Sequence, residues 1–348
     1  MTGIFERKTG HEQVVFCNDN ETGLRAIIAI YSTSLGPALG GVRFYPYADE
    51  ESATNDVLNL SKGMAYKNAV AGLHYGGGKA VIFGTPETDK TQQLLWAYAR
   101  FVESLGGRYI TACDLGTTIE DMDVISGETT HVAGRSRRMG GAGDPSSVTA
   151  YGVYRGMAAC AEVCWGVTSL RGRSIGVSGV GKVGTLLVEL LVAEGASVVV
   201  YDVDERALEH IQRTHPAVEV AADHNTLISR DLDVYAPCSI GGVLDRQVAE
   251  RLRCSIVCGA ANNQLSEPTI AQSLHDRCIL YAPDYVVNAG GVLHVAGELD
   301  GFDSRLAKHR ASEIYDTMIK ILRASETDGL PPVVIADRLA ERIMSYRG

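Results

Sequence analysis

The feature that most restricts the fold of this chain is a glycine pattern that follows a short apolar run. The run SIGVSGV leads into Gly179, Gly181 and Gly184, spaced as Gly-x-Gly-x-x-Gly with Lys182 and Val183 between them, and an apolar stretch follows. In a strand–turn–helix unit, the first glycine permits the tight turn, the second lets the backbone approach a pyrophosphate, and the third lets helix and strand pack closely. The pyrophosphate then lies at a helix N-terminus, where free N–H groups favour an anion. The pattern therefore predicts a dinucleotide site.

An acidic residue stands where such a site needs one. Asp202 ends the next apolar run, 23 residues after Gly179, and an acid there can accept hydrogen bonds from the adenosine ribose hydroxyls. Because a carboxylate repels a 2′-phosphate, Asp202 favours NAD over NADP, although Arg206 lies close in sequence. The simpler alternative is a glycine turn beside a solvated aspartate.

The second half of the chain has the rhythm of an α/β domain. The runs SVVVYDV, LDVYAPC, SIVCGA and ILYAP are typical of buried strands, and helical stretches such as VGTLLVELLVAEG separate them. This alternation predicts a doubly wound parallel sheet with helices on both faces, a Rossmann-type domain.

The first half has a different pattern. Residues 11–19 and 24–33 indicate a β-hairpin, and apolar periodicity predicts helices over about 49–67 and 89–105. The glycine cluster 76–78 leads into a short strand at 79–84.

The length of 348 residues corresponds to about two domains, at roughly 150 residues each. We expect an N-terminal α/β domain over 1–140 and the dinucleotide-binding domain over 141–330, with a cleft between them. The amphipathic C-terminal helix, about 331–348, is expected to dock back on the first domain.

Composition excludes several classes of partner. The net charge is −10 and no basic arm occurs, so nucleic acid is a poor candidate. No apolar run approaches the roughly 20 residues of a membrane-spanning helix, and the N-terminus lacks the apolar stretch of a secretion signal, so we expect a cytoplasmic protein without a membrane partner. The eight cysteines lack zinc-ligand spacing, and no metal is expected.

Two lysines flank the glycine cluster, Lys67 in GMAYKNAVAG and Lys79 in GGGKAV. A chain reversal between them can bring both ammonium groups to one pocket, where one binds a carboxylate and the other, with its pKa lowered by burial and by its neighbour, takes part in acid–base chemistry. Asp114, which ends YITACD, is the available carboxylate for proton transfer. The alternative is a pair of surface lysines and a capping aspartate.

These segments carry a resemblance to a known family. The matching stretches are LGPALGGVRFYPY, SKGMAYKNAVAGL, YGGGKAVI, GRYITACDLGT, SSVTAYGVYRGM, GVGKVG, YAPCSIGGVL, CGAANNQL and YAPDYVVNAGGV. They resemble the amino-acid dehydrogenases of the glutamate, leucine, phenylalanine and valine group over nearly the whole chain. The resemblance is strongest to the actinobacterial valine and leucine dehydrogenases.

The resemblance implies a reaction and roles for individual residues. It implies reversible NAD-dependent oxidative deamination of a branched-chain or other apolar L-amino acid to the 2-oxo acid and ammonia. Lys67 would bind the substrate carboxylate, helped by the backbone at Gly40 and Gly41. Lys79 would activate the attacking water, and Asp114 would exchange protons with the substrate amine. Members of the family are homo-oligomers, from dimers to octamers, which use the first domain.

Further positions match the family's cofactor and substrate contacts. Thr149 matches a contact to the nicotinamide carboxamide, and Asn262 and Asn288 match residues that line the cofactor–substrate cleft. The positions that match the substrate side-chain pocket are all aliphatic; they are Leu39, Ala112, Val292 and Val295. Since none offers a hydrogen-bond donor, a charged side chain would lose its hydration there.

Some residues depart from the leucine-active pattern. Gly297 stands where those relatives usually have aspartate, His294 with Gly297 resembles the phenylalanine-active branch, and Cys113 stands where glutamate is frequent. These departures leave an aromatic amino-acid dehydrogenase open as an alternative. Two others are a catalytically silent NAD-binding protein on the same fold and a hydroxy-acid dehydrogenase that needs no ammonia.

Overall fold

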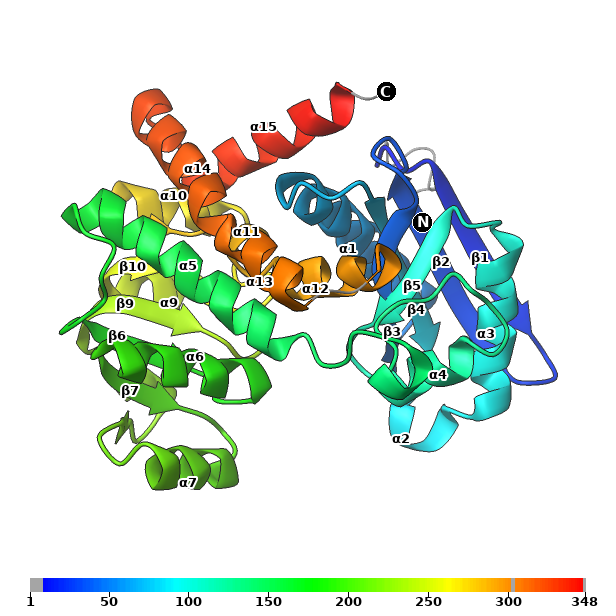
Figure 1. Ribbon diagram of the computed structural model, residues 1–348, viewed down its shortest axis with the longest axis horizontal. Coiled ribbons are helices and arrows are strands. Elements are labelled where there is room, and N and C mark those ends of the chain that lie inside the picture. The colour runs from blue at the N-terminus through cyan, green and yellow to red at the C-terminus, as the bar shows by residue number, and fades with distance from the viewer. Residues whose placement is uncertain (1–8, 302–303, 347–348) are drawn as a thin grey trace. The chain divides into compact units, whose positions relative to one another are not determined.

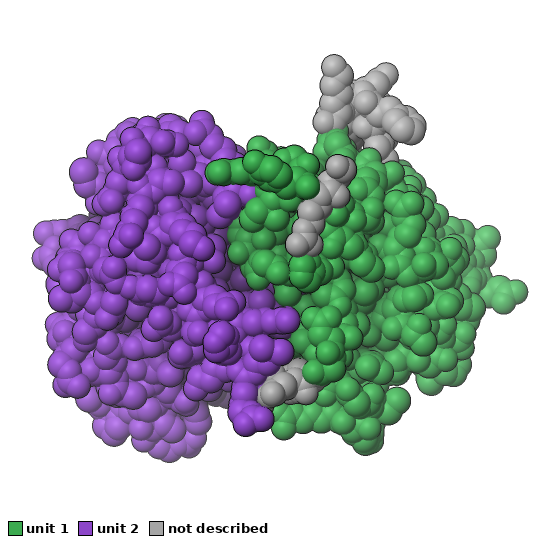
Figure 2. Space-filling view, turned by 45° about the horizontal axis from the view of Figure 1, so that its top comes forward, with its two compact units in different colours: residues 1–144, 294–304, 340–348 green, residues 145–293, 305–339 purple. Residues whose placement is uncertain are grey.

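The computed structural model describes residues 9–301 and 304–346, and the chain divides into two compact units. Unit 1 comprises residues 1–144, 294–304 and 340–348, and unit 2 the rest (Figure 2). The expected division, 1–140 and 141–330, therefore differs from the structure. Residues 294–304 belong to unit 1. Of the C-terminal helix, only the end, from residue 340 onward, belongs to unit 1. Patterns within an element cannot reveal this, because α12 (Gly290–Leu299) and α15 (Pro332–Ser345) each pass from one unit to the other.

Unit 1 is built on a mixed five-stranded sheet in the order β1-β2-β4-β3-β5. Its strands are β1 (Gln13–Asp19), β2 (Leu24–Ser32), β3 (Ala38–Tyr45), β4 (Gly76–Phe83) and β5 (Tyr109–Cys113). The first two form the predicted antiparallel hairpin. β2 is antiparallel to β4, whereas β3 lies between β4 and β5 and is parallel to both.

Helices cover both faces of this sheet because β2 is apolar on both. Ala26, Ile28 and Ile30 belong to the core beneath α3 (Gln92–Ser104). The alternate residues Ile27 and Ala29 pack with the apolar face of α1 (Glu50–Val70). Both helices match the predicted ones within a few residues, and Figure 1 shows them beside the sheet. Three shorter helices complete the unit; they are α2 (Pro86–Asp89), α4 (Ile119–Ile125) and the 3₁₀ turn at Arg137–Met139.

The glycine cluster 76–78 forms the first three residues of strand β4, whereas it was expected to precede the strand. A Cβ at Gly77 would lie 2.1 Å from the backbone nitrogen of Ala65 on α1, and one at Gly78 would lie 2.8 Å from the ring of Tyr109. These glycines therefore let the helix and the neighbouring strand approach the backbone of β4. Close tertiary packing, rather than local turn chemistry, explains them.

Unit 2 carries a six-stranded sheet in the order β11-β10-β9-β6-β7-β8, and every pair in it is parallel, as predicted. Its strands are β6 (Ser174–Ser178), β7 (Ser197–Tyr201), β8 (Glu219–Val220), β9 (Asp231–Pro237), β10 (Arg253–Val257) and β11 (Leu280–Tyr281). The strand order reverses at β6, because β7 pairs with one of its edges and β9 with the other. In open α/β sheets, ligands bind outside the carboxyl ends of the strands at such a switch point.

Helices cover the unit 2 sheet as well. One face carries an apolar core that includes residues of α8 (His224–Ile228), α9 (Arg246–Arg251) and α10 (Thr269–Asp276). α5 (Ser146–Trp165) and α14 (Ile314–Asp328) pack side by side (Figure 1). The remaining helices are α6 (Lys182–Glu194), α7 (Glu205–Thr214), α11 (Asp284–Val287) and α13 (Ser304–Ser312). In the part of the chain that the structure describes, no helix has the length and apolar character needed to span a membrane.

Candidate active site

Lys79 and Asp114 form an ion pair in unit 1. Lys79 points from the middle of β4 and is 5% exposed, and its Nζ lies 3.2 Å from Oδ2 of Asp114, which directly follows β5. Hydrogen bonds from the Asp114 backbone N–H to Thr117 Oγ1 (2.9 Å) and from that hydroxyl to the Val42 carbonyl (2.9 Å) hold this turn. Two residues singled out in the sequence are thus brought into direct contact.

Sequence reasoning missed a third member of this cluster, Arg43 on β3. Its Nε donates to Oδ2 of Asp114 at 3.0 Å, and its NH1 donates to Oδ2 of Asp56 on α1 at 2.9 Å. The Tyr47 hydroxyl also donates to that Asp56 oxygen, at 2.5 Å. The only available signal was the position of Arg43 in LGPALGGVRFYPY, because nothing local links it to residues on β5 and α1.

The charges around Asp114 favour its ionised form. Burial by itself raises the pKa of the Asp114 carboxyl, but the cations of Lys79 and Arg43 outweigh it, so that pKa lies below its ordinary value. Both cations contact Oδ2. Asp114 is therefore a carboxylate able to accept a proton, and Oδ1 is the oxygen to which neither cation donates a hydrogen bond.

Lys67 lies in the last turn of α1 and is half-buried. Its neighbour Asn68 binds this turn to β3 and to β4, the strand that carries Lys79. Asn68 donates from Nδ2 to the carbonyls of Gly76 (2.6 Å) and Leu39 (3.3 Å), and it has no exposed surface. The position of the turn on the sheet is therefore fixed by buried hydrogen bonds.

Gly40 and Gly41 lie inside β3. The residues on either side pair with β4, but the ladder to β4 is interrupted at these two, which pair only with β5. A Cβ at Gly40 would lie 1.8 Å from the Gly78 carbonyl oxygen, and one at Gly41 would lie 2.4 Å from that of Cys113. Glycine is thus required where the backbones of three strands approach one another.

The predicted side-chain pocket residues do not all fall in one unit. Leu39 on β3 has no exposed surface, and Ala112 on the adjacent β5 is also buried. Val295 belongs to unit 1, whereas Val292 belongs to unit 2. His294, which suggested the aromatic branch, is buried in unit 1 and donates from Nε2 to the Ala142 carbonyl at 3.2 Å.

In unit 2, the glycine pattern has the geometry of a phosphate-binding turn. Gly179 follows β6 with a φ of 102°, and a Cβ there would lie 2.6 Å from the Ser239 backbone nitrogen. A Cβ at Gly184 would lie 2.0 Å from the Gly179 carbonyl oxygen, so helix and turn are in close contact. Gly181 has nothing within 4 Å of its Cβ position and begins α6 without a side-chain cap. Lys182 and Val183 form the first turn of that helix.

These features fit a dinucleotide. The protein itself leaves space at Gly181, so that glycine keeps the backbone open to a ligand rather than to a neighbouring residue. The first amides of α6 lack a side-chain acceptor, as expected where an anion serves instead. Asp202, directly after β7, accepts the backbone N–H of Val180 on Oδ2 at 2.7 Å and that of Asp204 on Oδ1 at 2.9 Å. Its carboxylate is thereby held beside the turn.

The unit 2 residues predicted to meet the nicotinamide also cluster. Asn288 is 5% exposed and donates from Nδ2 to Oδ1 of Asn262 at 2.8 Å, and its own Oδ1 is a buried acceptor without a partner among the described residues. Thr149 on α5 lies beside the first turn of α12, because a Cβ at Gly291 would be 3.0 Å from its Oγ1.

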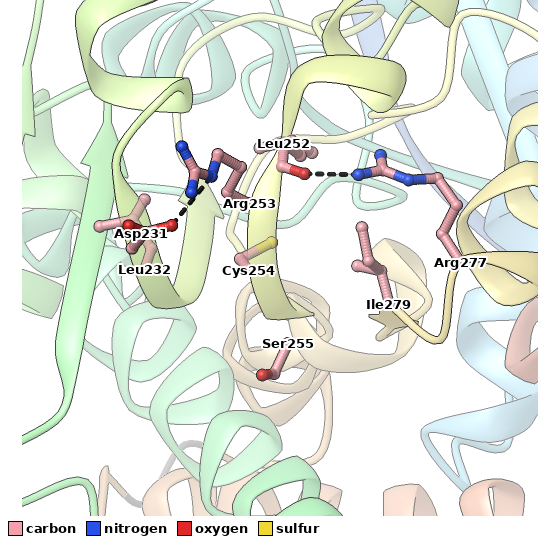
Figure 3. A pocket seen from close by; sticks show the side chains of 8 residues that line it. All are labelled: Asp231, Leu232, Leu252, Arg253, Cys254, Ser255, Arg277 and Ile279. Atoms are coloured by element: carbon pink, nitrogen blue, oxygen red, sulfur yellow. Dashed lines mark hydrogen bonds and ion pairs between the residues drawn. The ribbon is translucent and has the colours of Figure 1, made fainter.

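A surface pocket of unit 2 lies elsewhere, at the amino-terminal ends of β9 and β10 (Figure 3). Arg253 pairs there with Asp231 at 2.9 Å, and Arg277 donates to the Leu252 carbonyl at 2.8 Å. The glycine turn follows the carboxyl end of β6, at the opposite edge of the sheet. None of the predicted site residues lines this pocket.

Comparison with known proteins agrees with this geometry. Residues 11–131 match the family model described as Glu/Leu/Phe/Val dehydrogenase, dimerisation domain, and residues 140–327 match that of Glutamate/Leucine/Phenylalanine/Valine dehydrogenase. Valine dehydrogenase of Streptomyces virginiae is 58% identical over 97% of this chain and 94% of that protein. Leucine dehydrogenase of Bacillus subtilis is 47% identical over 97% and 92%.

Among solved structures, L-tryptophan dehydrogenase from Nostoc punctiforme is similar, with a TM-score of 0.85, 40% sequence identity and 98% of each chain covered. The family matches together span most of the chain, and the curated relatives are aligned over nearly their full lengths. The chain belongs to the glutamate/leucine/phenylalanine/valine dehydrogenase family.

Proposed function

We propose that this chain catalyses the reversible NAD-dependent oxidative deamination of a branched-chain or other apolar L-amino acid to the 2-oxo acid and ammonia. The observation that carries the proposal is the buried contact between Lys79 and Asp114 in unit 1. A cation and a carboxylate in hydrogen-bond reach supply both requirements of the reaction, charge stabilisation and proton transfer. The valine and leucine dehydrogenases similar to the chain support the substrate class.

Asp114 accepts the proton that the substrate ammonium must lose before its α-carbon can give up a hydride. Its ionised state follows from the cations beside it. Water then adds to the imino carbon and releases one proton to solvent, which gives the neutral carbinolamine. Asp114 returns its proton to the amino nitrogen, and the C–N bond breaks as the carbinolamine hydroxyl loses its proton to solvent, so that ammonia and the 2-oxo acid are formed. The Lys79 ammonium stabilises the negative charge that develops on the hydroxyl oxygen in this step.

Lys67 binds the substrate carboxylate, with backbone groups at Gly40 and Gly41 beside it. An ammonium suits this task because it is a point charge with three donors. The aliphatic residues Leu39 and Ala112 favour valine, leucine and isoleucine over phenylalanine, because Leu39 occupies space that a ring needs. Discrimination between apolar side chains is weak, about 1–3 kcal/mol per methylene, so several aliphatic amino acids should react.

NAD is held by the turn at Gly179, Gly181 and Gly184, with its ribose hydroxyls on Asp202. The negative charge of Asp202 disfavours the 2′-phosphate of NADP. Thr149, Asn262 and Asn288 meet the nicotinamide end, where the unpartnered Oδ1 of Asn288 can accept from an amide. When bound, the nicotinamide ring supplies the acceptor for the substrate hydride. The match of residues 11–131 to a dimerisation domain supports assembly into a homo-oligomer.

To test the proposal, the consumption of NADH is measured by its absorbance with a panel of 2-oxo acids, with and without ammonium, for the wild type and for Lys79→Ala. We expect ammonium-dependent oxidation of NADH with aliphatic oxo acids and a loss of at least about 10²-fold in Lys79→Ala, the typical effect of removing a group that stabilises the developing negative charge. Lys62→Ala is the matched control, because Lys62 is an exposed lysine of the same unit, where it lies over the ring of Tyr66.

Three results would contradict the proposal. No turnover with any oxo acid would indicate a silent NAD-binding protein, and turnover without ammonium would indicate a hydroxy-acid dehydrogenase. A preference for phenylpyruvate or indolepyruvate over aliphatic oxo acids would indicate an aromatic amino-acid dehydrogenase, as in the structural relative that is 40% identical.

A further inference from the structure

We propose that Arg43 is a positioning residue that gives the two oxygens of Asp114 different roles. It binds Oδ2 and so orients the carboxylate, and Oδ1 then exchanges protons with the substrate amine. This inference rests on the proposed function and adds to it a residue and an atom.

The geometry of Arg43 sets the orientation of the Asp114 carboxylate. Nε of Arg43 contacts Oδ2 of Asp114 at 3.0 Å, while NH1 contacts Asp56 at 2.9 Å. Asp56 is held in turn by the Tyr47 hydroxyl at 2.5 Å. The planar guanidinium is thereby attached to α1 at one end and to Asp114 at the other, so it resists rotation. Since Lys79 also contacts Oδ2, the free face of the carboxylate is that of Oδ1.

The chemistry needs a second cation besides Lys79. During the reaction the Lys79 ammonium must also interact with water and with the developing oxyanion, so its contact with Asp114 varies along the reaction path. The arginine side chain keeps its positive charge at every working pH, and it can donate hydrogen bonds but not accept them. Arg43 therefore maintains a constant positive charge beside Asp114, and this charge keeps the carboxylate ionised while Lys79 changes partners.

The other titratable groups near Asp114 do not replace this charge. Lys79 faces it from β4, Tyr47 from the segment after β3, and Tyr109 and Cys113 from β5. Burial raises the pKa of the Cys113 thiol to about 12, and it raises those of both tyrosines. All three are thus neutral near pH 7, and the balance at Asp114 is set by the two cations.

The experiment is the pH profile of kcat/KM for oxidative deamination by the wild type, Arg43→Gln, Arg43→Lys and Asp56→Asn. The ionisation of the substrate is common to all four, so differences report on the enzyme. We expect Arg43→Gln to lose at least about tenfold at the optimum and its acid limb to move to higher pH, because one of two cations near Asp114 is gone. Arg43→Lys should recover part of the rate with the acid limb near that of the wild type.

Asp56→Asn is the control for structure, because it removes the support of Arg43 but keeps the charge beside Asp114. We expect a smaller loss of kcat and no upward shift of the acid limb. NADH binding, measured by fluorescence, should be unchanged in all variants, because the glycine turn belongs to unit 2.

A rate loss in Arg43→Gln that is equal at every pH would overturn the proposal, since it would indicate packing alone. A rate within about twofold of wild type would overturn it as well. If Arg43→Gln does not fold, Arg43→Lys decides: wild-type rates at all pH values would show that the guanidinium geometry is not needed. A wild type without any turnover would instead refute the proposed function itself.

Discussion

Replacing Glu298 with alanine should destabilise unit 1 strongly, because this buried carboxylate accepts hydrogen bonds from the backbone of the loop that contains residues 134–142. Its side chain is fully buried, and it accepts the backbone N–H groups of Gly134 (2.9 Å) and Ala142 (3.0 Å). It also pairs with Arg135 Nε at 2.9 Å. Glu298 lies on the part of α12 that belongs to unit 1, so its contacts connect distant segments of one unit.

The magnitude follows from the groups that alanine would leave without an acceptor. Two buried backbone donors cost about 1–3 kcal/mol each when unpaired. Arg135 is 29% exposed, so water can solvate its guanidinium and the lost ion pair adds less. We therefore expect the free energy of unfolding of unit 1 to fall by about 3–5 kcal/mol, within the range for breaking one side of a buried pair.

The two tryptophans of the chain allow each unit to be followed separately. Trp96 lies on α3 in unit 1 and Trp165 on α5 in unit 2. In a Trp165→Phe background, urea unfolding followed by tryptophan fluorescence reports unit 1 alone. Glu128→Ala, at an exposed position of the same unit, is the matched control and should change stability by about 0.5 kcal/mol or less. A decrease below about 1 kcal/mol for Glu298→Ala would refute the reasoning.

Four further predictions can be tested on purified protein. Lys67→Ala should raise KM for the 2-oxo acid by at least about tenfold, because an ion pair with the carboxylate is lost; an unchanged KM would show that another group binds it. Asp202→Ser should narrow the preference for NAD over NADP in kcat/KM, and equal use of both by the wild type would contradict our interpretation of Asp202. Leu39→Ala should raise kcat/KM for L-phenylalanine relative to L-valine by about tenfold or more, whereas no gain would exclude Leu39 from the pocket. Burial lowers the pKa of His224 below its ordinary 6.5, so the neutral imidazole contributes fully to the stability of unit 2 above pH 6.5, and this contribution is lost as the pH falls through the pKa of the folded state. His224→Gln should therefore reduce the loss of unit 2 stability on acidification, measured by Trp165 emission. An unchanged dependence of stability on pH would disprove this prediction.

The dinucleotide-binding unit could be predicted from the sequence because its determinants are local. Gly179, Gly181 and Gly184 lie within six residues, and Asp202 ends the next strand. The strand–turn–helix unit that they form needs no distant partner to be recognised. The alternation of apolar runs and helices likewise specifies parallel pairing, because a crossover helix forces neighbouring strands to run in the same direction.

The unit 1 cluster depended on the tertiary structure. Lys79 and Asp114 could be singled out from local motifs, but the contact between them required β3, β4 and β5 to lie side by side. Arg43 lies 71 residues from Asp114 in sequence, and no periodicity along the chain relates the two. Their proximity results from β3 pairing in parallel with β5, which is a long-range choice.

The division of the chain into two units likewise depended on the tertiary structure. Residues 294–304 and 340–348 belong to unit 1 although they lie far along the chain. Glu298 accepts N–H groups from residues more than 150 positions earlier, and Tyr66 donates to Glu341 at 2.7 Å. Amphipathic patterns predict that a helix must bury one face, but they do not specify against which partner. That partner is selected by shape and hydrogen-bond complementarity between distant segments, which exists only once the chain has folded.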